Sequence, residues 1–166
     1  YGLEYYHDHV NSFRSGSTIQ GPVADDATYD LLGVYVQDEI EITDRLGLTI
    51  GGRFTYAAVD ADSVEDPNTG NQIAISEDWM AGVGNARLDY ELIREKVNIF
   101  GGVAQGFRAP NLSDLTRFDT ARSNEFEIPA PGLDPEYYLT GEVGVKARFE
   151  RATAQASYFY TDISDQ

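Results

Sequence analysis

Apolar and polar residues alternate along most of this chain with the period of two that characterises β-strands. The pattern is clearest between residues 31 and 56, where two such runs flank Thr43–Arg45. Because successive strand residues point to opposite faces, these runs predict a hairpin with a tight turn at Thr43–Arg45. One face is expected to carry Val34, Val36, Leu48 and Ile50, and the other Tyr35, Gln37, Thr49 and Arg53.

The strand-like runs are joined by connections of two kinds. Short turns are expected near Thr43–Arg45, Ile93–Lys96 and Glu150–Arg151, and longer polar loops at residues 11–30, 59–77 and 107–136. About seven runs result. They are Tyr1–Val10, the two strands of the hairpin, Asp78–Tyr90, Val97–Gly106, Tyr137–Phe149 and Ala152–Ile163. Short turns that alternate with long loops are typical of a transmembrane β-barrel, whose apolar face meets lipid and whose polar face lines the lumen. The expected fold is all-β, an antiparallel up-and-down meander.

The last two runs predict their own register across the turn at Glu150–Arg151. The expected opposite pairs are Val143 with Tyr158, Val145 with Ala156, and Ala147 with Ala154, all on the apolar face. Glu142, Lys146, Arg148, Thr153 and Gln155 then share the polar face.

Aromatic side chains support the same orientation, because several lie near strand ends that adjoin long loops. These are Tyr5, Tyr56, Trp79, Phe107, Tyr137, Tyr138, Tyr158 and Tyr160. Tyr and Trp are favoured at membrane–water interfaces, where the ring is in contact with lipid and its polar group stays hydrated. We therefore expect these residues to form the outer aromatic girdle of the barrel.

Composition excludes several classes of protein. The formal net charge of -16 argues against nucleic-acid binding, because no basic surface is available to displace counterions from phosphates. The chain has no cysteine, so disulfides and thiolate metal sites are excluded. No apolar run approaches the roughly 18 residues that a membrane-spanning helix needs. The chain begins at Tyr1 within a strand-like run, without an initiator Met or a signal peptide, so we expect it to be a piece of a longer protein.

Four groups of segments, in order along the chain, resemble the barrel of TonB-dependent outer-membrane receptors. Val34–Glu39, Ile42–Leu46 and Gly51–Phe54 are similar to the family's "YVQDE…TDRL…GxRY" hairpin. Gly106–Leu115 contains the "FRAP" sequence that precedes an extracellular loop. Ala130–Glu136 and Gly141–Lys146 resemble "NPxLxPE" followed by an "ELGxK" strand, and Tyr158–Ile163 resembles a recurrent strand end. Each match is short, but the ordered set covers nearly the whole chain.

The resemblance implies a 22-stranded barrel filled by an N-terminal plug, of which this chain would supply about seven strands. Residues 1–166 would all belong to the barrel domain, with the plug, the TonB box and the C-terminal strand absent. The implied protein is a multi-pass barrel in the Gram-negative outer membrane, in contact with lipid. It would take up an iron complex of the siderophore or haem type, or another scarce nutrient, when the TonB–ExbB–ExbD system acts on the plug. No cofactor and no enzyme activity are expected.

The "FRAP" and "PxLxPE" motifs also resemble those that flank a loop in haem and haemoglobin receptors, and residues 116–123 are similar to the haemoglobin/transferrin-type branch. Ligand contacts are therefore expected from Phe107, Arg108, Pro110, Asn111, Arg117, Arg122, Pro131, Leu133 and Pro135. The family's haem receptors place a histidine between the two motifs, and its absence here argues against direct haem ligation from this loop. The alternative is structural: Pro110 and Pro135 would fix where strands leave and re-enter the wall.

The spacing of the residues does not define a metal site. His7 and His9 alternate onto one face and are the candidate ligands for iron or haem, with ordinary polar lining as the alternative. The sequence shows no nucleophile with a positioned base, no phosphate-binding glycine loop and no zinc signature. Three other classes of protein stay open at this point: a passive porin, an outer-membrane barrel enzyme, and a soluble β-sandwich binding module, which would need both sheets to hide their apolar faces.

Overall fold

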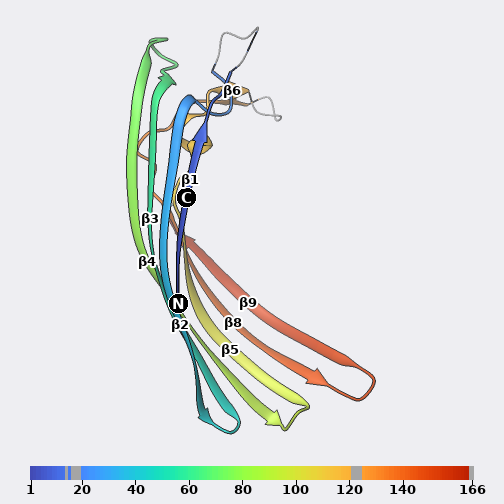
Figure 1. The fold of residues 1–166 in the computed structure, drawn as a ribbon. Coiled ribbons are helices and arrows are strands. Elements are labelled where there is room, and N and C mark those ends of the chain that lie inside the picture. Colours follow the sequence, from blue (N-terminus) through green and yellow to red (C-terminus); the bar gives the residue numbers. More distant parts are fainter. Residues whose placement is uncertain (14, 16–19, 121–124, 165–166) are drawn as a thin grey trace.

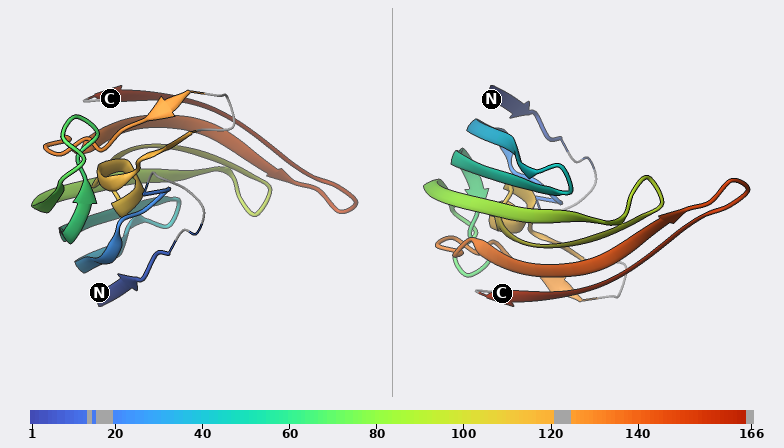
Figure 2. Two further views of the ribbon diagram at one scale, coloured as in Figure 1. Left: turned by 90° about the horizontal axis from the view of Figure 1, so that it is seen from above. Right: turned by 90° about the horizontal axis from the view of Figure 1, so that it is seen from below.

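The computed structural model describes residues 1–13, 15, 20–120 and 125–164, and one large antiparallel sheet dominates it (Figure 1). In sequence order its strands are β1 (Gly2–Val10), β2 (Asp25–Thr43), β3 (Leu46–Glu65), β4 (Gln72–Ile93), β5 (Val97–Arg108), β8 (Glu136–Arg148) and β9 (Thr153–Ser164). Between β5 and β8 lie helix α1 (Leu112–Thr116) and the short strands β6 (Asp119–Thr120) and β7 (Phe126–Glu127). The predicted all-β meander is confirmed, and the sheet is curved but not closed (Figure 2). In the parts of the chain just named, no helix has the length and apolar character that a bilayer crossing requires.

Both predicted hairpin registers are confirmed. Val34 lies opposite Phe54 and Tyr35 opposite Arg53, so the apolar and polar sets fall on separate faces. The chain turns at Asp44–Arg45, where the Thr43 hydroxyl oxygen accepts hydrogen bonds from the N–H groups of Arg45 (3.3 Å) and Leu46 (3.1 Å). In the last hairpin the observed pairs are Val143 with Tyr158, Val145 with Ala156, and Ala147 with Ala154.

The convex face of the sheet carries an apolar band, which Asp38 interrupts on β2. Directly opposed residues share a face, and one such row joins Tyr5, Leu32, Tyr56 and Met80 across four strands. From this row the band extends toward the short turns, and it leaves Val36 60% and Val143 55% exposed. On β2 it runs from Leu32 to Ile40, with Asp38 as a charged position opposite Ile50. This length is close to the 9–11 residues that a tilted strand needs to cross a bilayer. This surface suits lipid and not water.

The concave face behind the apolar band is polar, and its long side chains lie flat on glycines of neighbouring strands. Arg53 lies over Gly33 and forms an ion pair with Glu4 at 2.9 Å. Phe100 lies over Gly144 in the same way, so a Cβ atom at either glycine would collide with the covering side chain. Long side chains on this face therefore lie along the wall and do not project into the space inside the curve.

Beyond the row of Leu32 and Tyr56, the apolar and polar faces exchange sides. The next row on the convex face contains Asp30, Ala58 and Asp78, which suit water. The concave face becomes apolar instead, and its buried residues are Ala27, Ala57, Val59, Ala61, Val64 and Ile75. The extension of β3 past Tyr56, at about 3.3 Å per residue, projects roughly 25–30 Å beyond the apolar band (Figure 1). The projecting parts of β2–β4 are thus built as a sheet of a water-soluble protein.

Because the apolar and polar faces exchange sides, two loop predictions are wrong. The expected loops at residues 11–30 and 59–77 are shorter, because β2 already begins at Asp25 and the β3–β4 connection comprises only residues 66–71. The connection keeps its predicted turn sequence, with the Gly70 N–H donating to the Asp66 carbonyl at 2.8 Å and Gly70 at φ +68°. Apolar and polar residues still alternate through the two segments that were expected to be loops, but the apolar residues now lie on the opposite face of the sheet.

The exchange of faces also corrects part of the aromatic girdle. Tyr5, Tyr56, Phe107, Tyr137, Tyr158 and Tyr160 share the convex face as predicted. Trp79 and Tyr138 belong to the concave face, because Trp79 lies opposite Ala57 and Tyr138 lies opposite Gly106. The Trp79 Nε1–H instead donates a hydrogen bond to the Leu133 carbonyl at 3.3 Å.

Strands β4 and β5 separate toward the long-loop end. Their pairing ends at Asn85 opposite Ala104, and one residue further the Gly84 N–H donates to the Gln105 side-chain oxygen at 3.2 Å. Strand β4 continues to Gln72, whereas β5 ends at Arg108. The wall is therefore tall at β2–β4 and short at β5, β8 and β9 (Figure 1).

The exchange of faces predicts opposite outcomes for one substitution at two positions of β2. Val36→Lys places a charge in the apolar band and is expected to cost about 2–4 kcal/mol near the bilayer midplane. Thr28→Lys lies on the same face above the band, so its cost is expected to be small. Unfolding of the intact protein in lipid bilayers by urea measures both. Equal destabilisation by the two substitutions would contradict the boundary.

Candidate functional site

The longest connection folds back into the curve of the sheet, where α1 lies against the wall (Figure 2). Helix α1 begins with a capping box. The Asn111 side-chain oxygen accepts from the Asp114 N–H at 3.0 Å, and the Asp114 carboxylate accepts from the Asn111 N–H at 3.1 Å. Both groups would otherwise be unsatisfied at a helix start, so these two side chains fix where the helix begins.

Arg108 ties the two ends of this connection together. Its guanidinium lies 2.7 Å from the Asp114 carboxylate and 2.8 Å from the Glu136 carboxylate. Glu136 also accepts a hydrogen bond from the Tyr138 hydroxyl. Arg108 belongs to β5, Asp114 to α1 and Glu136 to β8, so one side chain joins the strand that leaves the wall to the helix and to the strand that returns.

The buried side of α1 continues the apolar surface of the projecting sheet. Leu112 and Leu115 pack in one cluster with Ala24, Ala27, Val59, Ala61, Val64 and Ile75. Thr116 is fully buried beside them, and its hydroxyl accepts from the Ala24 N–H at 3.0 Å and donates to the Leu112 carbonyl at 2.7 Å. The two leucines are three residues apart and so share one face of the helix.

The connection between β1 and β2 holds α1 from a second side. The Ser113 hydroxyl donates to the Pro22 carbonyl at 3.1 Å. Gly21 and Phe118 exchange backbone hydrogen bonds of 2.8 and 2.9 Å. Gln20 accepts from the Glu65 N–H at 2.8 Å and donates to the Thr116 carbonyl, so it bridges β3 and α1. The two long connections therefore form one packed unit on the wall.

After Phe118 the connection leaves the wall as the β6–β7 pair. Phe126 contacts Phe118 edge-on at 5.3 Å between ring centroids, and Glu127 forms an ion pair with Arg117. Phe126 is nevertheless 56% exposed and Ile128 is 54% exposed, whereas Phe118 is 6% exposed. Large apolar side chains thus face water at this end of the molecule.

The ligand residues that the sequence predicts lie at several separate places in the structure. Arg108 and Asn111 hold α1, Pro110 is buried beside them, and Arg117 pairs with Glu127. Phe107 lies on the convex face against Tyr137, with ring centroids 5.6 Å apart. Pro131 and Leu133 are exposed and Pro135 is half-buried at the return to β8, while Arg122 lies outside the described residues. No single cavity brings the described members of this set together.

His7 and His9 lie on the convex face and do not line the concave one. His7 Nδ1 is 2.8 Å from the Asp30 carboxylate, which also accepts from the Tyr5 hydroxyl at 2.6 Å, and His9 Nε2 is 3.7 Å from Asp26. Both histidines of the chain therefore point away from the space inside the curve. Within the described part of the chain, no group of three or more His, Cys, Asp or Glu side chains could hold a metal ion.

The β3–β4 turn, at the long-loop end of the molecule, holds an ionised carboxylate. Hydrogen bonds from the Thr69 hydroxyl (2.7 Å) and the Asn68 N–H (3.0 Å) lower the pKa of Asp66, the Thr69 contribution being the larger. These bonds stabilise the turn once the carboxylate is ionised.

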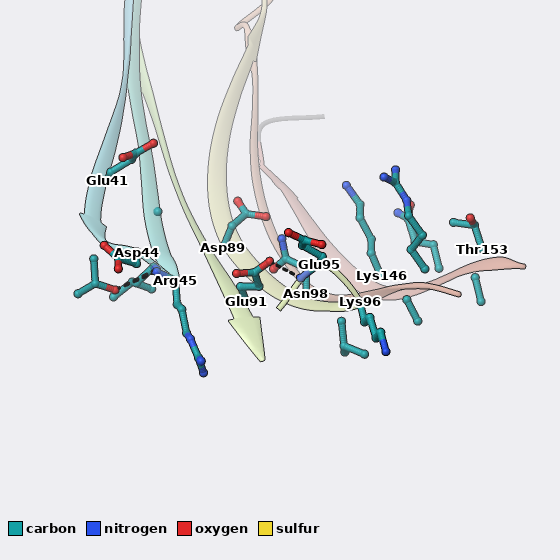
Figure 3. Close-up of a pocket in the computed structure, with 18 residues that line it drawn as sticks. Glu41, Asp44, Arg45, Asp89, Glu91, Glu95, Lys96, Asn98, Lys146 and Thr153 are labelled. Atoms are coloured by element: carbon teal, nitrogen blue, oxygen red, sulfur yellow. Dashed lines mark hydrogen bonds between the residues drawn. The ribbon is translucent and has the colours of Figure 1, made fainter. Parts of the chain in front are cut away.

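A cavity of about 540 Å³ lies at the opposite end, inside the curve near the short turns (Figure 3). Charged side chains of both signs line it, including Glu41, Asp89, Glu91, Lys96 and Lys146. The Glu91 carboxylate accepts from the Glu95 N–H at 2.6 Å and holds the β4–β5 turn. This surface suits water or a polar polypeptide segment, and its lining shows no nucleophile beside a base.

The sequence pattern does not indicate several residues that hold the packed unit together. Gln20 and Thr116 bridge segments that are far apart in the chain, and no local pattern indicates such partners. A signal for α1 was present in Asn111 followed by Asp114 and in the spacing of Leu112 and Leu115.

The profile of the family described as "TonB dependent receptor-like, beta-barrel" matches residues 1–166. No curated protein shows a significant sequence match to the chain. Among solved structures, the chain is similar to a double mutant of the Serratia marcescens hemophore receptor HasR in complex with its hemophore HasA and heme. The identity is 18% and the TM-score 0.83, over 98% of this chain and 29% of that chain.

Two further solved structures are similar. The copper transporter OprC is 16% identical with a TM-score of 0.69, over 84% of this chain and 22% of that chain. The ferric yersiniabactin uptake receptor FyuA from Yersinia pestis is 22% identical with a TM-score of 0.60, over 84% and 21%. The chain thus spans less than a third of each of these proteins, and at such identities the likeness concerns the fold.

The Thr116 hydroxyl is expected to hold the packed unit on the wall. Thr116→Val leaves the buried Ala24 N–H without its acceptor, which is expected to cost about 1–3 kcal/mol. Faster amide hydrogen exchange at Ala24 in the intact protein is the measurement. The exposed Thr120 of the same connection provides the matched control, Thr120→Val. A Thr116→Val variant that exchanges as slowly as the control would refute this role.

Proposed function

The chain belongs to the TonB-dependent receptor β-barrel family, and on that premise we propose that it forms part of the wall of an outer-membrane transporter. The observation that carries the proposal is the pairing of an exposed apolar convex band with a polar concave face, since a soluble sheet would hide its apolar side. In this proposal the band faces lipid of the Gram-negative outer membrane. The remaining strands and the plug come from the rest of a longer protein, and the plug communicates with TonB–ExbB–ExbD.

We propose an iron complex as the transported ligand. The similar structures support a metal-related cargo, because they include a receptor crystallised with heme, a ferric yersiniabactin uptake receptor and a copper transporter. Both histidines face outward, so this segment is not expected to supply an axial histidine to haem. Contacts with the ligand would then come from other side chains of the wall and loops.

The connection between β5 and β8 is the part of this chain that we propose takes part in ligand capture. It lies at the long-loop end, which is extracellular in barrels of this kind. Within it, Arg108, Pro110, Asn111 and Arg117 would act by holding the connection in place, and Leu133 is exposed at its return. No enzymatic role is proposed, since the family and its similar structures are transport receptors.

The proposed orientation predicts which turns can be labelled from outside the cell. In the intact receptor, Asn68→Cys lies in the β3–β4 turn and is expected to react with a membrane-impermeant maleimide on whole cells. Asp44→Cys lies in a short turn and is expected to react only after permeabilisation. Glu150→Cys, in another short turn, should behave like Asp44→Cys. Labelling of Asp44→Cys on intact cells would reverse the orientation.

The proposed transport predicts energy-dependent uptake. A strain that expresses the full receptor is expected to accumulate one of three radiolabelled iron complexes: haemin, a ferric catecholate or a ferric hydroxamate. Cu(II) is the fourth probe, and accumulation of Cu(II) alone would contradict an iron complex as the ligand. Deletion of tonB is expected to abolish accumulation of the iron complex, because a barrel closed by a plug does not pass a bulky complex passively. Uptake that persists without TonB would instead indicate a porin.

A further inference from the structure

The β5–β8 connection consists of two parts that differ in their contacts. Residues 109–118 are bound to the wall: Leu115 and Thr116 are 0% exposed, Leu112 and Leu115 pack against buried residues of β2–β4, and hydrogen bonds with the β1–β2 connection hold the segment from a second side. We call these residues the anchor segment. Moving it during transport would expose its buried leucines and leave the Ala24 N–H without the Thr116 hydroxyl as its acceptor. Such a segment is built to stay in place.

Phe126 and Ile128 have the opposite character. They are 56% and 54% exposed, and they flank the half-buried Glu127, with Phe126 in β7 and Ile128 directly after it. This alternation of burial places both apolar side chains on the exposed side. We call this pair the apolar ridge. It lies beyond the apolar band, at the long-loop end of the molecule, where lipid does not cover it. Exposed large apolar side chains at such a place are typical of contact surfaces.

The anchor segment supports the apolar ridge directly. The ring of Phe126 rests edge-on against buried Phe118, and Glu127 is paired with Arg117. A side chain that is already held in position loses little conformational freedom when a ligand binds. The ridge therefore has the properties of a preformed contact and not of a flexible tip.

We propose that residues 109–118 stay docked on the wall throughout transport, and that Phe126 and Ile128 are the specificity-determining ligand contacts that this anchor positions. The proposal rests on the proposed transport function. The chemistry that a phenyl ring beside the sec-butyl side chain of isoleucine recognises is a flat apolar or aromatic surface. Porphyrin and catechol rings both offer such a surface, so haemin and a ferric catecholate are the probes.

This assignment gives Arg108 and Asn111 a role different from ligand contact. The charge of Arg108 is satisfied by two carboxylates, and the Asn111 side chain caps α1. Both are positioning residues in this scheme, and the sequence motif that contains them encodes the attachment of the connection.

A disulfide tests the anchor segment in the full-length receptor. Ala24→Cys with Thr116→Cys joins α1 to the residue that precedes β2, and Thr140→Cys with Thr161→Cys joins two paired wall strands as the control. Uptake by oxidised cells is expected to stay within twofold of the reduced state for both pairs. A tenfold or greater loss for the first pair alone would show that the segment must move.

Labelling of Thr116→Cys alone gives a second readout that needs no ligand to be known. It is expected to remain unreactive toward a membrane-impermeant maleimide on energised cells, with or without haemin or the ferric catecholate. Phe126→Cys is expected to react, and to be protected by the probe that the receptor takes up. Reaction of Thr116→Cys during transport would overturn the fixed anchor.

Substitutions test the apolar ridge. Phe126→Ala is expected to weaken binding of the recognised probe by up to about tenfold, since aromatic contacts contribute about 0.5–1.5 kcal/mol. Phe126→Tyr retains the ring and should bind normally, as should Thr120→Ala on the paired strand. Unchanged binding by both Phe126→Ala and Ile128→Ser would overturn the ridge. A wild-type receptor that takes up neither haemin nor the ferric catecholate contradicts the ridge. One that takes up none of the three iron complexes contradicts the proposed function as well. Labelling at Thr116 decides the anchor in either case.

Discussion

One sheet in this protein is suited to lipid over part of its height and to water over the rest. The row at which its apolar face changes from convex to concave determines where the long connections pack. Up to Leu32 and Tyr56 the convex face is apolar and the concave face is polar. Past that row Asp30 and Asp78 occupy the convex face, and Val59 and Ile75 occupy the concave one. A strand that leaves lipid and continues into water has no other way to remain a stable half-buried sheet.

The packed unit of the two long connections follows from that exchange. An apolar concave surface in water needs a cover, and α1 supplies it with Leu112 and Leu115. Small residues such as Ala27 and Ala61 let the helix approach closely. The polar groups that this packing buries are satisfied within the unit, with Thr116 accepting from the Ala24 N–H. Below the boundary no cover is required, so the concave face there keeps its charges and its open space.

The sequence predicts the lipid-facing part of this fold well and the projecting part poorly. Alternation about a short turn fixes the register, and both hairpin registers around Thr43–Arg45 and Glu150–Arg151 are confirmed. The loops expected at 11–30 and 59–77 are longer than the observed connections. The apolar residues change to the opposite face within these segments, and in the sequence such a change resembles the end of a strand. Side-chain bridges such as that of Gln20 depend on contacts between distant segments, and no local pattern encodes them. The motif at Gly106–Leu115 was recognised as a resemblance, but its part in holding α1 required the structure.

The difference in height between the two walls has a consequence for how such proteins diversify. Because the β5–β8 connection rises from the short wall and is fastened to the tall one before its exposed part begins, changes in β6 and β7 leave the buried contacts of α1 untouched and alter only the contacts of Arg117 and Phe118 at its end. Insertions, deletions and substitutions there cost the barrel little stability, whereas the same changes between Pro110 and Phe118 disturb a buried core. Mutation can therefore explore new ligands in one short stretch while the architecture that carries it is inherited intact.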